Sequence, residues 1–211
     1  MALLNETISA QLKQILANMK HPVTAVLVTR KDDCDTCADT ASFMQELSGL
    51  SDKLTLVEVD SASDTAVALK AEMFPAIILL DKDGKDRGIR FYGIPAGHEI
   101  NSFLSALMEL SGAGQPLPPA FAEKLAKVSK PVDIKVFVTL GCPHCPGAVS
   151  KAHKLALENP NIRAEMIEAQ TFQDMSRRYN VSGVPKIVFN DGPELLGDQP
   201  FEAFLATLEK L

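Results

Sequence analysis

The 211-residue sequence has no tryptophan, only two tyrosines and four histidines, and no cysteine outside two short motifs. So few aromatic side chains cannot form a stacking platform for single-stranded nucleic acid. The histidines show no spacing typical of a metal site or a catalytic triad. We therefore expect no metal, and expect His21, His98 and His153 to lie at the surface or the core boundary.

Basic residues in excess and long apolar segments are also missing. The formal net charge of −6 argues against nucleic acid or an anionic membrane as the main partner. No apolar run approaches the roughly 18 residues of a membrane-spanning helix. The first seven residues lack both a basic region and a long apolar region, so no signal peptide is expected. These absences predict a cytoplasmic protein that binds neither nucleic acid nor membrane.

All four cysteines belong to two Cys-x-x-Cys motifs, Cys34–Cys37 and Cys142–Cys145. Each motif follows an apolar, strand-like run and stands where a helix is expected to begin. Free N–H groups and the dipole at a helix N-terminus stabilise a thiolate, and a thiolate attacks disulfides. The motifs therefore predict dithiol–disulfide exchange at two sites. Cys34 and Cys142 are the expected nucleophiles. Cys37 and Cys145 are the expected resolving thiols.

Hydrophobic periodicity predicts similar elements in the same order in both halves of the chain. In the first half we expect helices at 12–19, 34–49, 65–71 and 98–110, and strands at 23–29, 54–59, 76–80 and 87–91. In the second half we expect helices at 120–128, 142–157, 172–179 and 201–208, and strands at 134–139, 163–167 and 186–190. Strand–helix–strand followed by helix–strand–strand–helix is the order of a thioredoxin-like unit.

The landmarks of the two halves keep a common register. Each cysteine of the first motif stands 108 positions before its counterpart, and Pro75 stands 110 positions before Pro185. A stretch rich in glycine and proline, 111–119, joins the halves. We therefore predict an α/β fold of two tandem thioredoxin-like units, 1–112 and 113–211. Each unit is expected to have a central mixed β-sheet flanked by helices.

A proline directly precedes a predicted strand in each half, in Phe74-Pro75 and Val184-Pro185. A proline is tolerated at a strand's first position in any case. In thioredoxin-like units, however, the proline at this place is cis and lies against the sulfurs. The likeness therefore implies two cis bonds. It also implies that Phe74 and Val184 present their main chain to an extended substrate.

The inner residues predict different chemistry for the two motifs. Pro143 suits the first position of a helix, and the imidazole of His144 favours a thiolate when it is protonated. Asp35 instead places a carboxylate where the first thiolate would form, which raises a thiol pKa. We expect the first pair to be more reducing and less reactive. The second pair should be more oxidising and more reactive.

Deprotonation of the buried resolving thiols calls for a proton acceptor. Glu58 and Glu168 end equivalent predicted strands and are candidates for this role. The alternative is that both are ordinary solvated carboxylates.

The chain resembles the protein disulfide oxidoreductases, glutaredoxin-like proteins with two fused thioredoxin-fold units and one Cys-x-x-Cys in each. The resemblance lies in residues 88–99, in 136–146 and in 183–188. It implies reduction, oxidation or isomerisation of protein disulfides. It also implies that no cofactor is bound and that electrons come from NADPH through a flavin thioredoxin reductase.

A related architecture is the N-terminal module of the flavin-linked alkyl hydroperoxide reductase, whose first unit lacks the cysteines. This resemblance implies an alternative function, in which the chain carries electrons from a flavin thioredoxin reductase to a peroxiredoxin.

Two alternatives involve no enzyme activity. Two Cys-x-x-Cys pairs can form a Cys₄ zinc site, although zinc ribbons space their pairs by about 15–20 residues and here 105 positions separate Cys37 from Cys142. The other alternative is an interaction scaffold, because a fold alone does not determine a function.

Overall fold

The structure is a computed structural model that describes residues 4–211. Residues 1–3 belong to the segment considered for a signal peptide and lie outside the described residues. The first half contains α1 (Glu6–Leu16), β1 (Val23–Thr29), α2 (Cys37–Ser48), β2 (Leu54–Asp60), α3 (Asp64–Ala68), β3 (Ala76–Leu80), β4 (Asp86–Tyr92), a 3₁₀ turn η1 (Gly97–Glu99) and α4 (Ile100–Leu110). The second half contains α5 (Pro119–Leu125), β5 (Val132–Val138), α6 (Cys145–Glu158), β6 (Ile162–Glu168), α7 (Gln173–Arg178), β7 (Lys186–Phe189), β8 (Glu194–Leu196) and α8 (Phe201–Leu208).

The helices after the two motifs begin later than predicted. Both start at the second cysteine, Cys37 or Cys145, and the first two residues after each nucleophile belong to the preceding loop. Pro143 therefore lies ahead of α6, and Pro146 takes up the early helical position instead. Because a proline lacks an N–H, it fits the first turn of a helix without losing a hydrogen bond. The expectation that Pro143 is the first helical residue was wrong.

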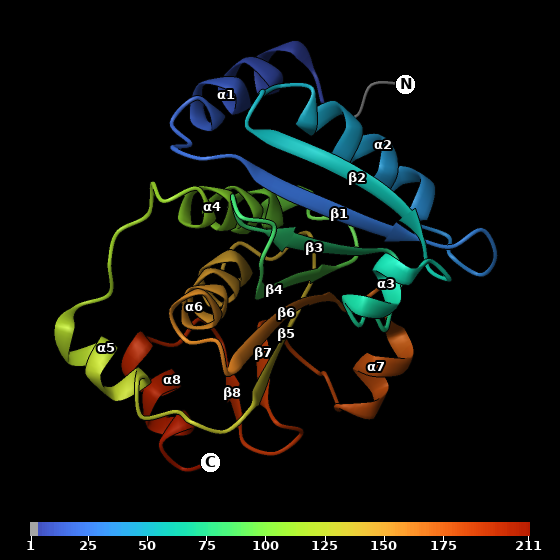
Figure 1. Ribbon diagram of the computed structural model, residues 1–211. Coiled ribbons are helices and arrows are strands. Elements are labelled where there is room, and N and C mark those ends of the chain that lie inside the picture. The colour runs from blue at the N-terminus through green and yellow to red at the C-terminus, as the bar shows by residue number, and fades with distance from the viewer. Residues whose placement is uncertain (1–3) are drawn as a thin grey trace.

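The eight strands within residues 4–211 form one sheet in the order β2-β1-β3-β4-β6-β5-β7-β8. The order within each half is the same, and the halves meet where β4 pairs with β6 in parallel, with Ile89 opposite Ala164 and Tyr92 opposite Ile167. The architecture is therefore a mixed α/β sheet flanked by helices, continuous across the two halves (Figure 1).

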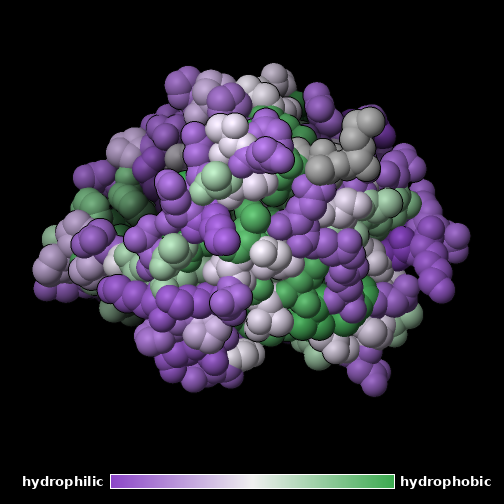
Figure 2. All heavy atoms as spheres, turned by 90° about the horizontal axis from the view of Figure 1, so that it is seen from above, coloured by the Kyte–Doolittle hydropathy of each residue, from purple (hydrophilic) through white to green (hydrophobic). Residues whose placement is uncertain are grey.

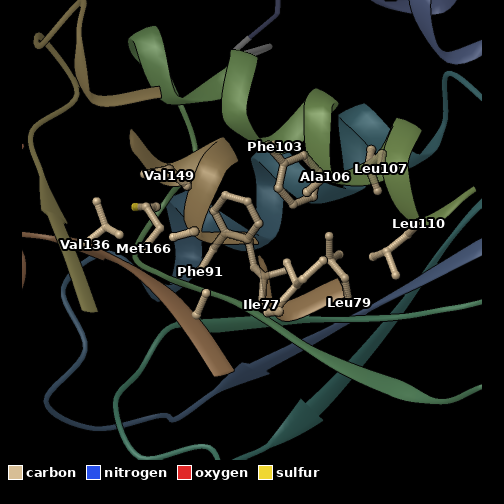
Figure 3. Close-up of a cluster of buried hydrophobic side chains, with 14 of the residues drawn as sticks. Ile77, Leu79, Phe91, Phe103, Ala106, Leu107, Leu110, Val136, Val149 and Met166 are labelled. Carbon is tan, nitrogen blue, oxygen red and sulfur yellow. The ribbon is translucent and has the colours of Figure 1, made fainter. Parts of the chain in front are cut away.

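The helices cover the two faces of this sheet unequally. Alternate strand residues, such as Leu27 and Val136, pack with α1, α2, α4, α6 and α8 in one large core. The intervening residues, such as Val28 and Phe137, pack with α3 and α7 in a smaller cluster on the other face. Figure 3 shows the large core passing between the halves, where Phe91 of β4 lies between α4 and α6. Its ring meets that of Phe103 edge-on at 5.0 Å.

His153 lies in this shared core, contrary to the expectation of a surface or boundary position. It is 2% exposed, its Nε2 lies 3.1 Å from the carbonyl oxygen of Arg90, and its ring packs on Phe91. Burial disfavours the charged imidazole and lowers the pKa of His153 to about 4. The histidine therefore packs α6 of the second half against β4 of the first.

Two general properties of residues 4–211 bear on function. Every helix in this range is too short or too polar to span a bilayer. The range also contains no group of three or more His, Cys, Asp or Glu side chains that could hold a metal ion. Hydrophilic side chains cover most of the face in Figure 2, with apolar ones gathered in smaller patches between them.

Candidate functional site

The two Cys-x-x-Cys motifs lie at the same end of the sheet. β1, β4, β6 and β5 all run in one direction, and the motifs follow the carboxyl ends of β1 and β5. Four strand spacings separate these two strands, which is roughly 19 Å. A disulfide needs sulfurs about 2 Å apart, so the two pairs cannot exchange directly in this arrangement.

The first pair is partly open to solvent and surrounded by acidic residues. Cys34 is half-buried and forms a disulfide with the buried Cys37, with Cα atoms 5.5 Å apart. The N–H of Cys37 donates to the backbone carbonyl of Cys34 at 3.4 Å, not to its sulfur. Arg30 holds the preceding loop by donating to the carbonyl and carboxylate of Asp33, each at 2.7 Å. Asp35 is exposed beside the nucleophile.

The second pair is more deeply buried, and a backbone amide reaches its nucleophile. Cys142 is 9% exposed and Cys145 is inaccessible, and the two form a disulfide. The N–H of Cys145 donates to the Sγ of Cys142 at 3.2 Å. An N–H group directed at this sulfur favours the thiolate once the disulfide is reduced. His144, between the cysteines, is exposed.

Both prolines that precede strands follow cis peptide bonds, Phe74–Pro75 and Val184–Pro185. The prediction of cis geometry is confirmed at both positions. The carbonyl oxygen of Val184 lies 3.9 Å from the Sγ of Cys142, while Phe74 lines a cleft together with Cys34. Main chain that could pair with an extended substrate therefore lies beside Cys142, and Phe74 lies in the same cleft as Cys34.

The two candidate proton acceptors have different surroundings. Glu58 is exposed on β2 and accepts a hydrogen bond from Gln45 at 2.7 Å. Glu168 is 3% exposed and accepts from the amide and hydroxyl of Thr171, each at 2.6 Å. Glu168 also lines the cleft that contains Cys34, the nucleophile of the other half.

A third carboxyl group, Glu99, was missed by sequence reasoning. Its side chain is completely buried and burial raises its pKa to about 7. Ser102 donates a hydrogen bond to one carboxylate oxygen, and the other oxygen, Oε1, has no hydrogen-bond partner within residues 4–211. The one available signal was its place at the end of the matching stretch 88–99.

The 3₁₀ turn η1, which contains Glu99, lies against the loop that precedes the second motif. This turn contacts α6, whose first residue is Cys145. The N–H of His98 donates to the carbonyl of Leu140, two residues before Cys142, at 2.9 Å. Gly97 makes this close approach possible, because a Cβ there would lie 2.4 Å from the same carbonyl oxygen. The turn is therefore pressed against the loop of the second motif.

Comparison with known proteins supports both halves of the architecture. The Thioredoxin domain family matches residues 132–210. An alkyl hydroperoxide reductase subunit of Pseudomonas aeruginosa is 30% identical over 98% of this chain and 37% of its own length. A Bacillus subtilis protein named NADH dehydrogenase is 25% identical over 97% of this chain and 38% of its own length. The chain thus spans little more than a third of these curated relatives.

Two solved structures match nearly the whole chain. The NTD_N/C domain of alkylhydroperoxide reductase AhpF from Enterococcus faecalis has a TM-score of 0.90 and 28% identity, with 97% of this chain and 99% of that chain covered. A protein disulfide oxidoreductase from Aeropyrum pernix K1 has a TM-score of 0.89 and 32% identity, with 97% and 92% covered. Both solved structures thus match the first half of this chain as well as the second.

Proposed function

The chain belongs to the thioredoxin-fold protein disulfide oxidoreductases, and from this premise we propose that its two Cys-x-x-Cys pairs exchange electrons with disulfides of other proteins. The observation that carries the proposal is the environment of Cys142. An amide N–H is directed at its sulfur, and the carbonyl of Val184, beside a cis-proline, lies 3.9 Å away. One group stabilises the attacking thiolate and the other can pair with the substrate's main chain.

The proposed reaction proceeds in two steps. When the second pair is reduced, the thiolate of Cys142 attacks one sulfur of a substrate disulfide, and the other substrate sulfur leaves as a thiolate that takes up a proton. The thiol of Cys145 then loses its proton and attacks Cys142, which releases the second substrate thiol. Two electrons pass from the pair to the substrate, together with the proton of Cys145, and solvent supplies the second proton because Cys142 reacts as a thiolate. The reverse sequence oxidises a substrate dithiol.

We assign the proton of Cys145 to Glu99 in the second step. Glu99 lies in a turn against the helix that begins at Cys145, and its pKa of about 7 suits proton exchange near neutral pH. Glu58, which is exposed, and Glu168, which is held by Thr171, remain predicted acceptors with less support.

The wider setting of the reaction belongs to the same proposal. The two functional units are 1–112 and 113–211, one around each pair. Disulfide-containing proteins are the substrates, and a flavin-containing thioredoxin reductase supplies the electrons. We expected NADPH as the source, and the name of the Bacillus relative adds NADH as a second nicotinamide to test. Cysteines used wholly in redox motifs favour the cytoplasm as the compartment.

A second candidate function is electron transfer to a peroxiredoxin. It is favoured by the similarity to the Pseudomonas alkyl hydroperoxide reductase over almost the whole chain. In this function the second pair would take electrons from a flavoprotein and reduce a peroxiredoxin disulfide, with the same two-step exchange.

An insulin-reduction assay tests the proposal. Wild type, Cys34→Ser and Cys142→Ser are driven by dithiothreitol, or by a thioredoxin reductase with NADPH or NADH, and a peroxiredoxin replaces insulin in a parallel series. We expect wild type to reduce insulin and Cys142→Ser to lose most of the rate. If no variant exceeds the dithiothreitol background, the proposed function is wrong. A rate with peroxiredoxin alone would establish the second candidate instead.

A further inference from the structure

A cleft of about 730 Å³ crosses the end of the sheet that holds both motifs. The first half contributes the loop of Cys34 and the segment Glu72–Phe74 before the cis-proline. The second half contributes Leu140 and most of the β6–α7 segment, which runs from Glu168, the last residue of β6, to Arg177 in α7. Cys34 therefore lines a cleft whose walls come from both units.

The charged side chains around this cleft are mainly acidic. Its lining includes five carboxylates and two guanidinium groups: Asp33, Asp35, Glu72, Glu168 and Asp174, with Arg30 and Arg177. Both arginines already pair with lining carboxylates, Arg30 with Asp33 and Arg177 with Asp174. The formal charge of the lining is thus −3. Glu72 and Asp174 are 66% and 95% exposed, so a bound segment can reach both carboxylates, although Arg163 lies 4.0 Å from Glu72 and Arg177 lies 2.5 Å from Asp174.

Between the charged groups the cleft is apolar. The apolar lining residues come from both halves: Met73, Phe74, Ile94, Leu140, Phe172 and Met175. The rings of Phe74 and Phe172 are fixed by their neighbours, Arg30 over Phe74 at 5.7 Å and Tyr92 edge-on to Phe172 at 6.2 Å. An extended chain rising about 3.3 Å per residue would cross the roughly 19 Å between the motif-bearing strands in about six residues.

We propose that this cleft binds an extended, basic segment of the substrate polypeptide, and that the β6–α7 segment of the second unit selects it for Cys34. The proposal rests on the proposed function and names the substrate class of its first site. Apolar side chains of the bound segment contact the floor, and a lysine or arginine next to the target cysteine faces the acidic rim. A segment with acidic flanks is repelled, because like charges meet in a partly enclosed cleft.

The test isolates the first pair in a Cys142→Ser, Cys145→Ser background. Three disulfide-linked peptides are compared that differ only in the residues flanking cysteine, which are Lys, Gln or Glu. At low ionic strength we expect kcat/KM to fall in the order Lys, Gln, Glu, with about tenfold or more between the extremes. The spread should shrink as salt is added, because salt screens exposed charges.

Charge reversal identifies the residues responsible. Glu72→Lys in the first unit and Asp174→Lys in the second should each reduce the Lys-over-Glu preference several-fold, and together should reverse it. Asp52→Lys is the matched control. It makes the same charge change just before β2, at the opposite end of the sheet, and should leave the preference unchanged. Equal rates for the Lys and Glu peptides, or a preference unaffected by Asp174→Lys, would overturn the proposal.

A binding measurement separates this proposal from the function on which it rests. Fluorescent versions of the Lys and Glu peptides, with serine in place of cysteine, are titrated with the protein and followed by anisotropy. Tighter binding of the Lys peptide, lost in the double charge reversal, supports the cleft as a docking site even if the Gln peptide is never reduced. Equal affinities reject the docking site whatever the reduction assays show.

Discussion

At the scale of single residues, the two redox pairs differ most in where one amide points. The N–H of Cys145 donates to the sulfur of Cys142, whereas the N–H of Cys37 donates to the backbone carbonyl of Cys34. An N–H directed at sulfur stabilises the thiolate and hence the reduced form. The inner residues of the motifs already predicted unequal reduction potentials for the two pairs. The different direction of this amide is a second, structural reason to expect them.

We predict that the second pair is the more oxidising by about 30 mV or more, which corresponds to about 1.4 kcal/mol for two electrons. Titration of each pair against dithiothreitol, with the other pair replaced by serine, measures both potentials. Asp35→Asn should narrow the difference, because it removes a carboxylate beside the first nucleophile. Equal potentials, or a more oxidising first pair, would show that the asymmetry is wrongly assigned.

Glu99→Gln should separate catalysis from stability. With a folded pKa of about 7 against an ordinary 4.5, ionising Glu99 at pH 8 costs roughly 3 kcal/mol of folding free energy. The variant should therefore be more stable than wild type at pH 8. It should also resolve the mixed disulfide at Cys145 about tenfold or more slowly, and lose the rise in rate around pH 7. Denaturant unfolding and stopped-flow kinetics measure the two effects. A variant of unchanged rate would remove Glu99 from the mechanism.

At the scale of the elements, the sequence predicted the bounds of apolar runs that have turn residues or proline at their ends. Strands at 23–29 and 76–80 and the helix at 201–208 have the predicted bounds, because each is a buried run bounded by turn residues or proline. The three-residue strand β8 was missed because so short a strand has no periodicity to detect. The motif helices begin late because residues between the cysteines remain in the loop that presents the nucleophile.

The pairing of β4 with β6 could not be predicted, since no local pattern encodes which edges of two sheets will meet. Gly88 is part of the reason that β4 and β6 can approach closely enough to pair. It has φ +79°, and a Cβ there would lie 2.6 Å from the carbonyl oxygen of Ile162. His153 was misjudged for the same reason: its neighbours Arg90 and Phe91 belong to the other half of the chain.

We predict that Gly88→Ala destabilises the protein by about 3 kcal/mol, because backbone strain adds to a clash between two paired strands. Gly84→Ala is the matched control. Its φ is +73° but nothing lies within 4 Å of the added Cβ, so only the strain of about 1 kcal/mol remains. Urea unfolding of both variants measures the difference. Similar losses of stability at the two positions would show that β4 and β6 can separate to accept an added methyl group at little cost.

At the scale of the whole molecule, the shared core makes folding of the two halves interdependent. Phe91, Phe103 and His153 bring β4, α4 and α6 together at the joint. The continuous sheet also holds the motif-bearing strands roughly 19 Å apart. Electrons can therefore pass between the two pairs only through a substrate or a flavoprotein, or after a rearrangement of the sheet that brings the sulfurs together.

The pKa shifts of two buried groups, His153 and Glu99, change stability in opposite directions as pH falls, and the raised pKa of the buried Glu165 acts in the same direction as that of Glu99. His153 has a folded pKa of about 4 against 6.5, so the folded state binds fewer protons and stability is lost between pH 6.5 and 4. Glu99 has the opposite sign, because its raised pKa adds stability as pH falls from 7 to 4.5. Each effect is roughly 3 kcal/mol, so their contributions largely cancel over this range.

His153→Leu should expose the hidden dependence on pH. Without the histidine, the contribution of Glu99 is no longer offset, and stability relative to pH 7 should rise on acidification to pH 5. Glu99→Gln should show the reverse, a loss of stability over the same interval. Replacing His21, which is exposed, by asparagine serves as the control and should preserve the shape of the wild-type curve. Urea unfolding from pH 7 to 5 measures all four proteins, and parallel curves for wild type and His153→Leu would mean that the joint does not hold its histidine uncharged.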